Sequence, residues 1–327
     1  MKSSHSIFWR NEYTLAALTV LALLAGSRLS SHFLDAGYLL GTTTLYVETG
    51  IMALLMTAII ICGHIDLSVA STLALTAAAT GVLHAQYAVP FWLACCLGML
   101  LAGMLGALNG VLIVGMNLPS LTVTLGTMAL YRGAAQILIG DHSVGGFPAW
   151  FCGVDQVYAG PFPVTLLLLL AGGCAMALFL QRTTLGRCIY AIGNNKTASR
   201  LSGLRVGAVE ALLFTLSGLA AGMCGLLMAS RLSVARFDMA SGKELDVITA
   251  VVLGGTDIFG GKGGVAGTLL ALCLLALLRT GMGLADIPSE KQQIVVGALL
   301  IGAIALPRLA ELARKQYMKR QKPAAAG

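Results

Sequence analysis

The sequence predicts an all-α, polytopic membrane protein with about ten transmembrane or membrane-embedded helices. Hydrophobic residues make up 57% of the 327-residue chain and charged residues only 11%, whereas a soluble domain carries about 25% charged residues. The apolar residues form long continuous runs, such as 51–61 and 91–114, which are typical of membrane-spanning helices. Strands of a membrane β-barrel would alternate apolar and polar residues instead. We expect residues 1–327 to form a single transmembrane domain.

Ten apolar segments have roughly the length that crosses the hydrocarbon core of a bilayer, or are somewhat shorter. They are 12–29, 45–62, 65–83, 91–114, 119–139, 164–181, 208–230, 245–255, 265–282 and 292–308. The eighth segment, 245–255, is too short to span alone, which predicts a broken or re-entrant helix. Only a short polar motif separates the second segment from the third.

Basic residues gather at three places, and their distribution predicts how the chain lies in the membrane. Residues 182–206 contain Lys and Arg but no acidic residue, residues 308–327 are strongly basic, and Lys2 and Arg10 precede the first segment. Because cytoplasmic loops collect Lys and Arg, we expect a cytoplasmic loop at 182–206, a basic cytoplasmic tail at 308–327 and both termini in the cytoplasm. Residues 140–163 contain no Lys or Arg and are expected outside.

Other functions that these features could suggest are not supported. The net charge of +7 is explained by the cytoplasmic loops, and no interleaving of aromatic and basic residues indicates nucleic-acid binding. GGTDIFGGKGG at 254–264 resembles a phosphate-binding loop, but Thr256 stands where the first glycine is required and Gly263 where Ser or Thr is required. We expect a glycine-rich turn there, with no nucleotide. The chain has eight cysteines, most of them within apolar runs, and no clustered metal-ligand pattern, so no cofactor and no metal are predicted.

A weak internal similarity suggests two related halves. AGMLGAL at 102–108 is similar to AGMCGLL at 221–227, and each precedes a stretch with a Leu-Gly centre, VTLGT at 123–127 and VLGGT at 252–256. Two related halves are common in transporters. Chance similarity between helices rich in Gly, Ala and Leu is the alternative.

The basic loop contains the pattern of a short, capped helix. Asn194 or Asn195 can accept free backbone N–H groups at a helix start, Lys196–Ser202 then supplies about two turns, and Gly203 suits the left-handed position after a helix end. A helix of this length is not stable alone in water. We therefore expect it to dock on a partner; a solvated basic loop near anionic lipid is the alternative.

The motif GHIDLSVAS, residues 63–71, places a carboxylate among apolar residues. A charge at membrane depth costs several kcal/mol and usually faces protein or water. Asp66 could cap the first turn of a helix with the help of Ser68 and Ser71, or it could contact a transported molecule. Asp246 is a candidate for the matching role in the second half.

Four motifs together resemble the permease subunits of bacterial ATP-binding-cassette sugar importers, the ribose, xylose, arabinose and rhamnose family that includes the autoinducer-2 permeases. The motifs are GHIDLSVAS (63–71), TLGRCIYAIGNNKTASRLSGLRV (184–206), ELDVITAVVLGGTDIFGGKGG (244–264) and, more weakly, LPSLTVTLGTMALYRG (118–133). His64 and Ala70 depart from the family pattern, which usually has glycine at both positions.

The resemblance implies a division of labour at the bacterial inner membrane. Two permease subunits, identical or different, would form the pathway, cytoplasmic ATPase subunits would hydrolyse ATP, and a periplasmic binding protein would deliver the sugar. This chain would be a lipid-embedded permease and not itself an enzyme. Coupling to the ATPase is expected of Asn194, Asn195, Lys196, Arg200, Leu201 and Gly203. Candidates for the translocation pathway are Asp66, Ser68, Asn109, Thr122 and Thr124, and candidates for the helix breaks are His64, Asp246, Gly254 and Gly255.

Three other functions compete with this one. A proton-coupled secondary transporter could use Asp66, Glu48 and Asp246 as relays, but it would not need the basic cytoplasmic loop. A branched-chain amino acid permease is a related alternative, although the Ile-Asp-Leu-Ser motif favours sugar. An intramembrane protease would need Gly-x-Ser-Gly with a paired His, or Gly-x-Gly-Asp, and the sequence contains neither in a fitting context.

Overall fold

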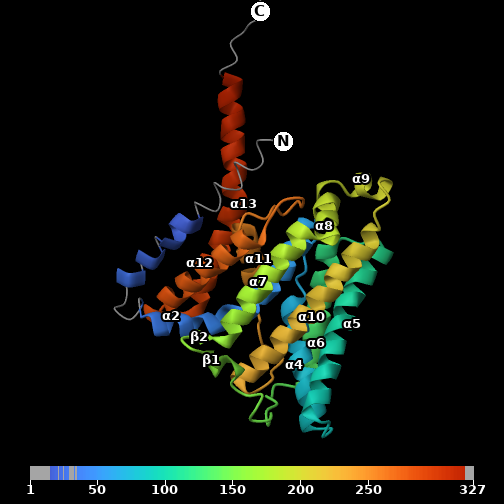
Figure 1. Cartoon of the computed structure of the whole chain (residues 1–327), viewed down its shortest axis with the longest axis vertical. Helices are drawn as coiled ribbons and strands as arrows, with labels where there is room; N and C mark the ends of the chain where they lie inside the picture. Colours follow the sequence, from blue (N-terminus) through green and yellow to red (C-terminus); the bar gives the residue numbers. More distant parts are fainter. Residues whose placement is uncertain (1–14, 21, 25, 29–32, 34, 321–327) are drawn as a thin grey trace, which may run out of the picture.

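The structure, a computed structural model, is a bundle of apolar helices (Figure 1). It describes residues 15–320 except 21, 25, 29–32 and 34. Lys2, Arg10 and residues 321–327 lie outside the described residues. After helical turns between Leu15 and Arg28, the helices are α2 (Ala36–Thr43), α3 (Val47–Ile61), α4 (Val69–Ala85), α5 (Phe91–Gly115), α6 (Ser120–Ile139), α7 (Val164–Arg182), α8 (Thr184–Asn194), α9 (Lys196–Leu201), α10 (Val206–Leu232), α11 (Lys243–Leu253), α12 (Val265–Leu284) and α13 (Ser289–Arg320), with short 3-10 turns η1 (Thr44–Tyr46) and η2 (Val154–Gln156). The two-residue strands β1 (Tyr158–Ala159) and β2 (Phe162–Pro163) pair in a short antiparallel hairpin.

The predicted all-α membrane fold is confirmed. Every apolar segment expected from 45–62 onward contains a helix, and α11 has only 11 residues, as the short eighth segment predicted. Five described helical stretches are long and apolar enough to cross a membrane: Ala36–Ile61, Phe91–Gly115, Val164–Arg182, Val206–Leu232 and Val265–Leu284.

Helix α8 was not expected inside the basic loop. Its apolar residues Leu185, Ile189 and Ile192 recur at a spacing that places them on one helix face, and Ile189 and Ile192 are buried. The side chain of Thr183 accepts a hydrogen bond from the N–H of Gly186 and so caps the helix start.

The core of the bundle is formed by α3 and α4. All of α3 except Leu55 is buried, as expected for a helix that is apolar on every side. Helix α4 packs against α5, α6 and α10, and α3 packs against α7, α10 and α11. The segment between α3 and α4 is therefore enclosed on several sides by other helices.

Helices α5 and α10 cross at small residues. A Cβ atom on Gly106 would collide with the carbonyl oxygen of Phe214, and one on Gly218 would collide with the carbonyl oxygen of Ala102. Without a hydrophobic effect between helices in lipid, such close backbone approach is a main source of packing energy. The two similar segments 102–108 and 221–227 meet where Gly222 packs against Ala102, while Gly225 packs against Leu73 of α4. Descent from related halves stays a prediction.

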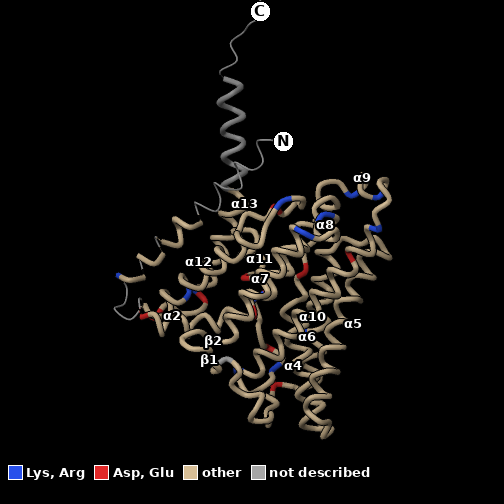
Figure 2. Tube along the Cα trace, viewed as in Figure 1, with Lys and Arg blue, Asp and Glu red and all other residues tan. Residues whose placement is uncertain are grey.

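The two ends of the bundle carry different segments. Helices α8 and α9 lie at one end, and α13 leaves the bundle in the same direction (Figure 1). The loop after α6 lies at the other end, where Val144 forms an isolated bridge with Ala235 from the loop after α10. Figure 2 shows Lys and Arg residues gathered along α8 and α9, whereas single acidic residues lie within the bundle.

We predict that Gly106→Ala destabilises the chain by about 1–3 kcal/mol, because the added methyl group overpacks the α5–α10 crossing. The matched control is Gly126→Ala on α6, where a Cβ atom meets nothing within 4 Å. Both variants gain the same helix propensity over glycine. Thermal unfolding in detergent should give a lower midpoint for Gly106→Ala only, and equal midpoints would contradict this account of the crossing.

Candidate functional site

A helix break lies inside the bundle between α3 and α4, as the sequence predicted. Gly63 adopts a left-handed conformation, with φ of +89°, and the N–H groups of Gly63 and His64 bond to the carbonyls of Ile60 and Ile59. This closes the C-terminus of α3 in the usual way for a glycine just past a helix end. The chain then runs without helical structure to Ser68, the residue that precedes α4.

Helix α6 satisfies the backbone of this break. The hydroxyl of Ser120 accepts a hydrogen bond of 3.3 Å from the N–H of Ile65, and the hydroxyl of Thr124 donates one of 3.3 Å to the carbonyl of Ile65. Backbone groups exposed at membrane depth would cost several kcal/mol each. These two side chains therefore replace the partners that a continuous helix would supply.

Asp66 does not cap α4 directly. Its Oδ1 accepts hydrogen bonds from the Ser68 N–H, at 3.0 Å, and the Ser68 hydroxyl, at 2.7 Å, so it orders the turn just before the helix. Ser71, which was expected to help, donates to the carbonyl of Ser68. Instead of capping the first turn of α4, Asp66 thus stabilises the tight turn that immediately precedes the helix.

Asp66 is the centre of a buried polar network that joins the first break to three helices. Ser217 of α10 donates to Asp66 Oδ2 at 2.8 Å, and Asn109 of α5 donates to the Ser68 hydroxyl at 2.8 Å. Tyr131 of α6 bonds to Asn109 at 3.4 Å. The side chains of Asp66, Ser68 and Asn109 are at most 2% exposed. Buried networks of this kind specify a unique arrangement because each unpaired member would be costly.

The structure brings four of the five pathway candidates together. Asp66, Ser68, Asn109 and Thr124 surround the break, whereas Thr122 is exposed on another face of α6. In this conformation Asp66 is enclosed by protein, so any contact with a transported molecule requires the surrounding helices to separate. The role of these residues in a pathway stays a prediction.

The second break follows α11. Gly254 has no room for a side chain, because a Cβ atom would stand 2.6 Å from the backbone of Gly267 in α12, and Gly255 has a φ of +88°. Asp246 lies at the other end of α11, in its first turn, and pairs with Arg279 of α12 at 2.6 Å. Asp246 thus joins α11 to α12 and does not itself form the break.

The two breaks meet next to the end of α8. The N–H of Gly261, in the loop after α11, donates to the carbonyl of Ile61 at 2.8 Å, and the Tyr190 hydroxyl donates to the carbonyl of Gly263 at 2.9 Å. A Cβ atom on Gly193 would collide with the Ile61 carbonyl. The loop 254–264 therefore acts as a packing element. The roles of Tyr190 and Gly193 in holding it were not predicted.

The predicted short helix in the basic loop is confirmed as α9. The side chain of Asn195 accepts a hydrogen bond of 2.9 Å from the N–H of Ala198, and Gly203 has a φ of +83°. Asn194 does not cap α9; its side chain donates to the carbonyls of Tyr190 and Gly261. Leu201 is 86% exposed, and Arg200 is exposed beside it.

An ion cluster connects α9 with the first break. Glu210 of α10, only 1% exposed, has its Oε1 atom 2.7 Å from Lys196 Nζ and 3.0 Å from His64 Nε2. The ring of His64 also lies edge-on to Phe214, with centroids 5.8 Å apart. Sequence reasoning missed Glu210, although an acidic residue one turn into an apolar segment is itself a signal of function.

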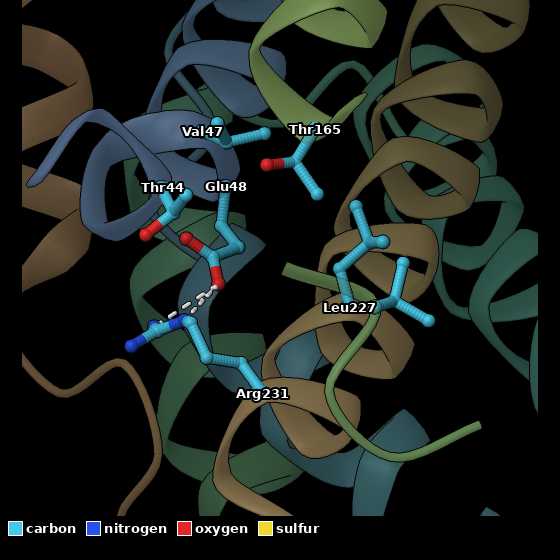
Figure 3. A pocket seen from close by; sticks show the side chains of 7 residues that line it. Thr44, Val47, Glu48, Thr165, Leu227 and Arg231 are labelled. Carbon is cyan, nitrogen blue, oxygen red and sulfur yellow. Dashed lines mark hydrogen bonds and ion pairs between the residues drawn. The ribbon is translucent and has the colours of Figure 1, made fainter. Parts of the chain in front are cut away.

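A second buried ion pair lies toward the opposite end. Arg231 of α10 bonds to Glu48 of α3 at 3.0 Å, so Glu48 is ion-paired (Figure 3). A cavity of about 10 Å³ adjoins the pair and is lined by Thr44, Val47, Val154, Thr165 and Leu227. Glu48 Oε2 and Thr165 Oγ1 have no hydrogen-bond partner among the described residues. The cavity is large enough for about one water molecule that could serve both groups.

Comparison with known proteins identifies the family to which the chain belongs. The family described as "Branched-chain amino acid transport system / permease component" matches residues 38–304, a range that contains both breaks, α8 and α9. The chain belongs to this permease family. It is therefore a multi-pass membrane transport component, and a protease or a proton-coupled secondary transporter is not favoured.

Relatives in this permease family support the sugar branch of the resemblance. The chain is 34% identical over 299 residues to the autoinducer 2 import system permease protein LsrD of Photorhabdus luminescens, covering 90% of each chain. It is 35% identical over 311 residues to LsrD of Escherichia coli K12, covering 93% of this chain and 94% of the relative. The LsrD protein of Shigella flexneri is equally similar. No solved structure matches the chain.

We predict that Asp66→Ala destabilises the permease by about 2–4 kcal/mol, because it removes an acceptor from buried hydroxyl and N–H donors. Asp66→Asn keeps an oxygen for Ser68 and should cost less than half as much. Thermal unfolding of the purified variants checks this order. Equal losses of stability would show that the carboxylate charge, and not the hydrogen-bond geometry, holds the break.

Proposed function

We propose that this chain is the permease subunit of an ATP-driven importer that carries autoinducer-2 or a similar small sugar, such as a pentose or a rhamnose-type deoxyhexose, across the bacterial inner membrane. The observation that carries the proposal is the similarity to autoinducer 2 import permeases along nearly the whole length of both chains. The printed description of the family, which refers to branched-chain amino acids, makes those amino acids the alternative substrate.

We infer that α9 is the coupling helix that docks on a cytoplasmic ATPase. It has only six residues, too few for stability alone, and it presents the 86% exposed Leu201. An apolar side chain so exposed at a basic, aqueous end of the molecule favours a protein partner over lipid. In this proposal residues 182–206 form the coupling loop, residues 308–327 form a basic tail near anionic lipid, and both termini are cytoplasmic.

The remaining partners follow from the same proposal. The pathway needs a second permease subunit, identical or different, and ATP is hydrolysed by the separate ATPase subunits. A periplasmic binding protein presents the sugar. The network around Asp66 is expected to open toward the pathway during the transport cycle.

Uptake measurements test the substrate. Cells that lack their own importer and express this permease with its ATPase and binding protein should accumulate labelled autoinducer-2. Unlabelled ribose, xylose and rhamnose are tested as competitors, with leucine as the competitor for the alternative. Uptake that persists with a protonophore and stops with vanadate supports the ATP-driven mechanism. Competition by leucine alone would overturn the sugar assignment.

Leu201→Asp should abolish substrate-stimulated ATP hydrolysis by the reconstituted importer, because a carboxylate replaces the exposed apolar contact of α9. The permease should still insert and unfold at the normal temperature, since Leu201 packs little against the rest of the chain. Leu201→Met is the matched control, because it conserves volume and hydrophobicity, and should retain stimulation. Normal stimulation of Leu201→Asp would remove α9 as the coupling element.

A further inference from the structure

Glu210 is the point at which three separate segments of the permease meet. Its carboxylate contacts Lys196, the first residue of α9, and His64, in the first break, while Glu210 itself belongs to α10. The carboxylate is 1% exposed, and the side chains of Lys196 and His64 are 39% and 13% exposed. A buried carboxylate that loses its partners becomes an uncompensated charge in a medium of low dielectric. The three parts therefore resist separation.

Helix α10 holds the first break at two points on one of its faces. Glu210 contacts His64, and Ser217 donates to Asp66 at 2.8 Å. Seven residues correspond to about two helical turns, so Glu210 and Ser217 lie on the same side of α10. The contacts made by His64 and Asp66 flank Ile65, whose backbone is held by α6. The break is thus fixed against α10 on both sides of that residue.

The carboxylate of Glu210 contacts its two partners with both oxygens. Lys196 Nζ donates a hydrogen bond of 3.0 Å to Oε2 and lies 2.7 Å from Oε1, while His64 Nε2 lies 3.0 Å from Oε1. The edge of the His64 ring on Phe214 restrains the imidazole. The carboxylate therefore connects Lys196 and His64 directly.

We propose that Glu210 is a positioning residue that transmits displacement of α9 to the break holding Asp66, by binding Lys196 and His64 at the same time. The inference rests on the proposed function, in which α9 docks on the ATPase. Displacement of Lys196 moves the carboxylate or breaks its bond, and either event changes the hold on His64 and on the network of Asp66, Ser68 and Asn109. The three polar contacts thus form one path from the cytoplasmic end to the buried network.

The experiment uses the complete importer, with ATPase and binding protein, reconstituted in lipid vesicles. Glu210→Gln should reduce substrate-stimulated ATP hydrolysis by about fivefold or more, the lower range of couplings between distant sites. The ATPase should still co-purify and keep its unstimulated rate, because α9 and Leu201 are unchanged. Lys291→Gln, an exposed lysine at the start of α13, is the matched control and should retain full stimulation.

Non-additivity separates a connected path from independent structural damage. Lys196→Gln and His64→Gln should each reduce stimulation, and neither should reduce it further in the Glu210→Gln background, because residues that act through one partner do not add. In contrast to Lys196→Gln, Lys196→Arg should retain stimulation, since a guanidinium can also bind the carboxylate. Multiplicative losses, or full stimulation of Glu210→Gln, would overturn the proposal.

Two further outcomes keep the conclusions distinct. If the Glu210→Gln permease fails to insert in the membrane, Lys196→Gln, His64→Gln and their double variant are measured instead. A loss of stimulation in the double variant equal to the product of the two single losses would then refute the path. If the wild-type importer shows no stimulation with any tested sugar, the proposed function fails. A wild type that responds while Glu210→Gln responds equally contradicts only the role of Glu210.

Discussion

The interruption between α3 and α4 is the constraint on which the rest of the structure depends. A bilayer offers no water to the free N–H and C=O groups of a broken helix, so other segments must supply every partner. Ser120 and Thr124 serve the backbone of Ile65, and Gly261 serves the carbonyl of Ile61. Helix α6 and the loop after α11 are thereby held around one short segment.

The buried charges follow a common rule. Glu48, Glu210 and Asp246 each bind a cation from another segment of the chain, whereas Asp66 is satisfied by hydroxyl and N–H donors alone. The ion pairs therefore hold neighbouring helices together through opposite charges, whereas the break at Asp66 is held by hydrogen bonds to groups without charge.

The fold could be predicted well from the sequence because the apolar composition of a membrane helix is a local property of the chain. Apolar runs located the helices, and Asn195 and Gly203 located α9, since caps depend only on neighbouring residues. The partners of the site could not be predicted in this way, because Asp66 and Ser217 are 151 residues apart. Thr122 and Thr124 show the same limit: they differ by two positions, which turns them to different helix faces, and residue type alone does not reveal which face is buried.

The contact between the two breaks has a consequence for how such permeases can diverge. The bond from Gly261 to Ile61 joins backbone atoms, so most side-chain changes at Ile61 leave it intact. Its main sequence requirements are glycine at 193, where a Cβ atom would collide with the Ile61 carbonyl, and glycine at 261, which has a φ of +78°. The cluster of His64, Glu210 and Lys196 depends instead on side chains that a single codon change removes. Mutation can therefore change how firmly the end of the bundle that carries α8 and α9 is tied to the interior, while the contact between the two breaks persists.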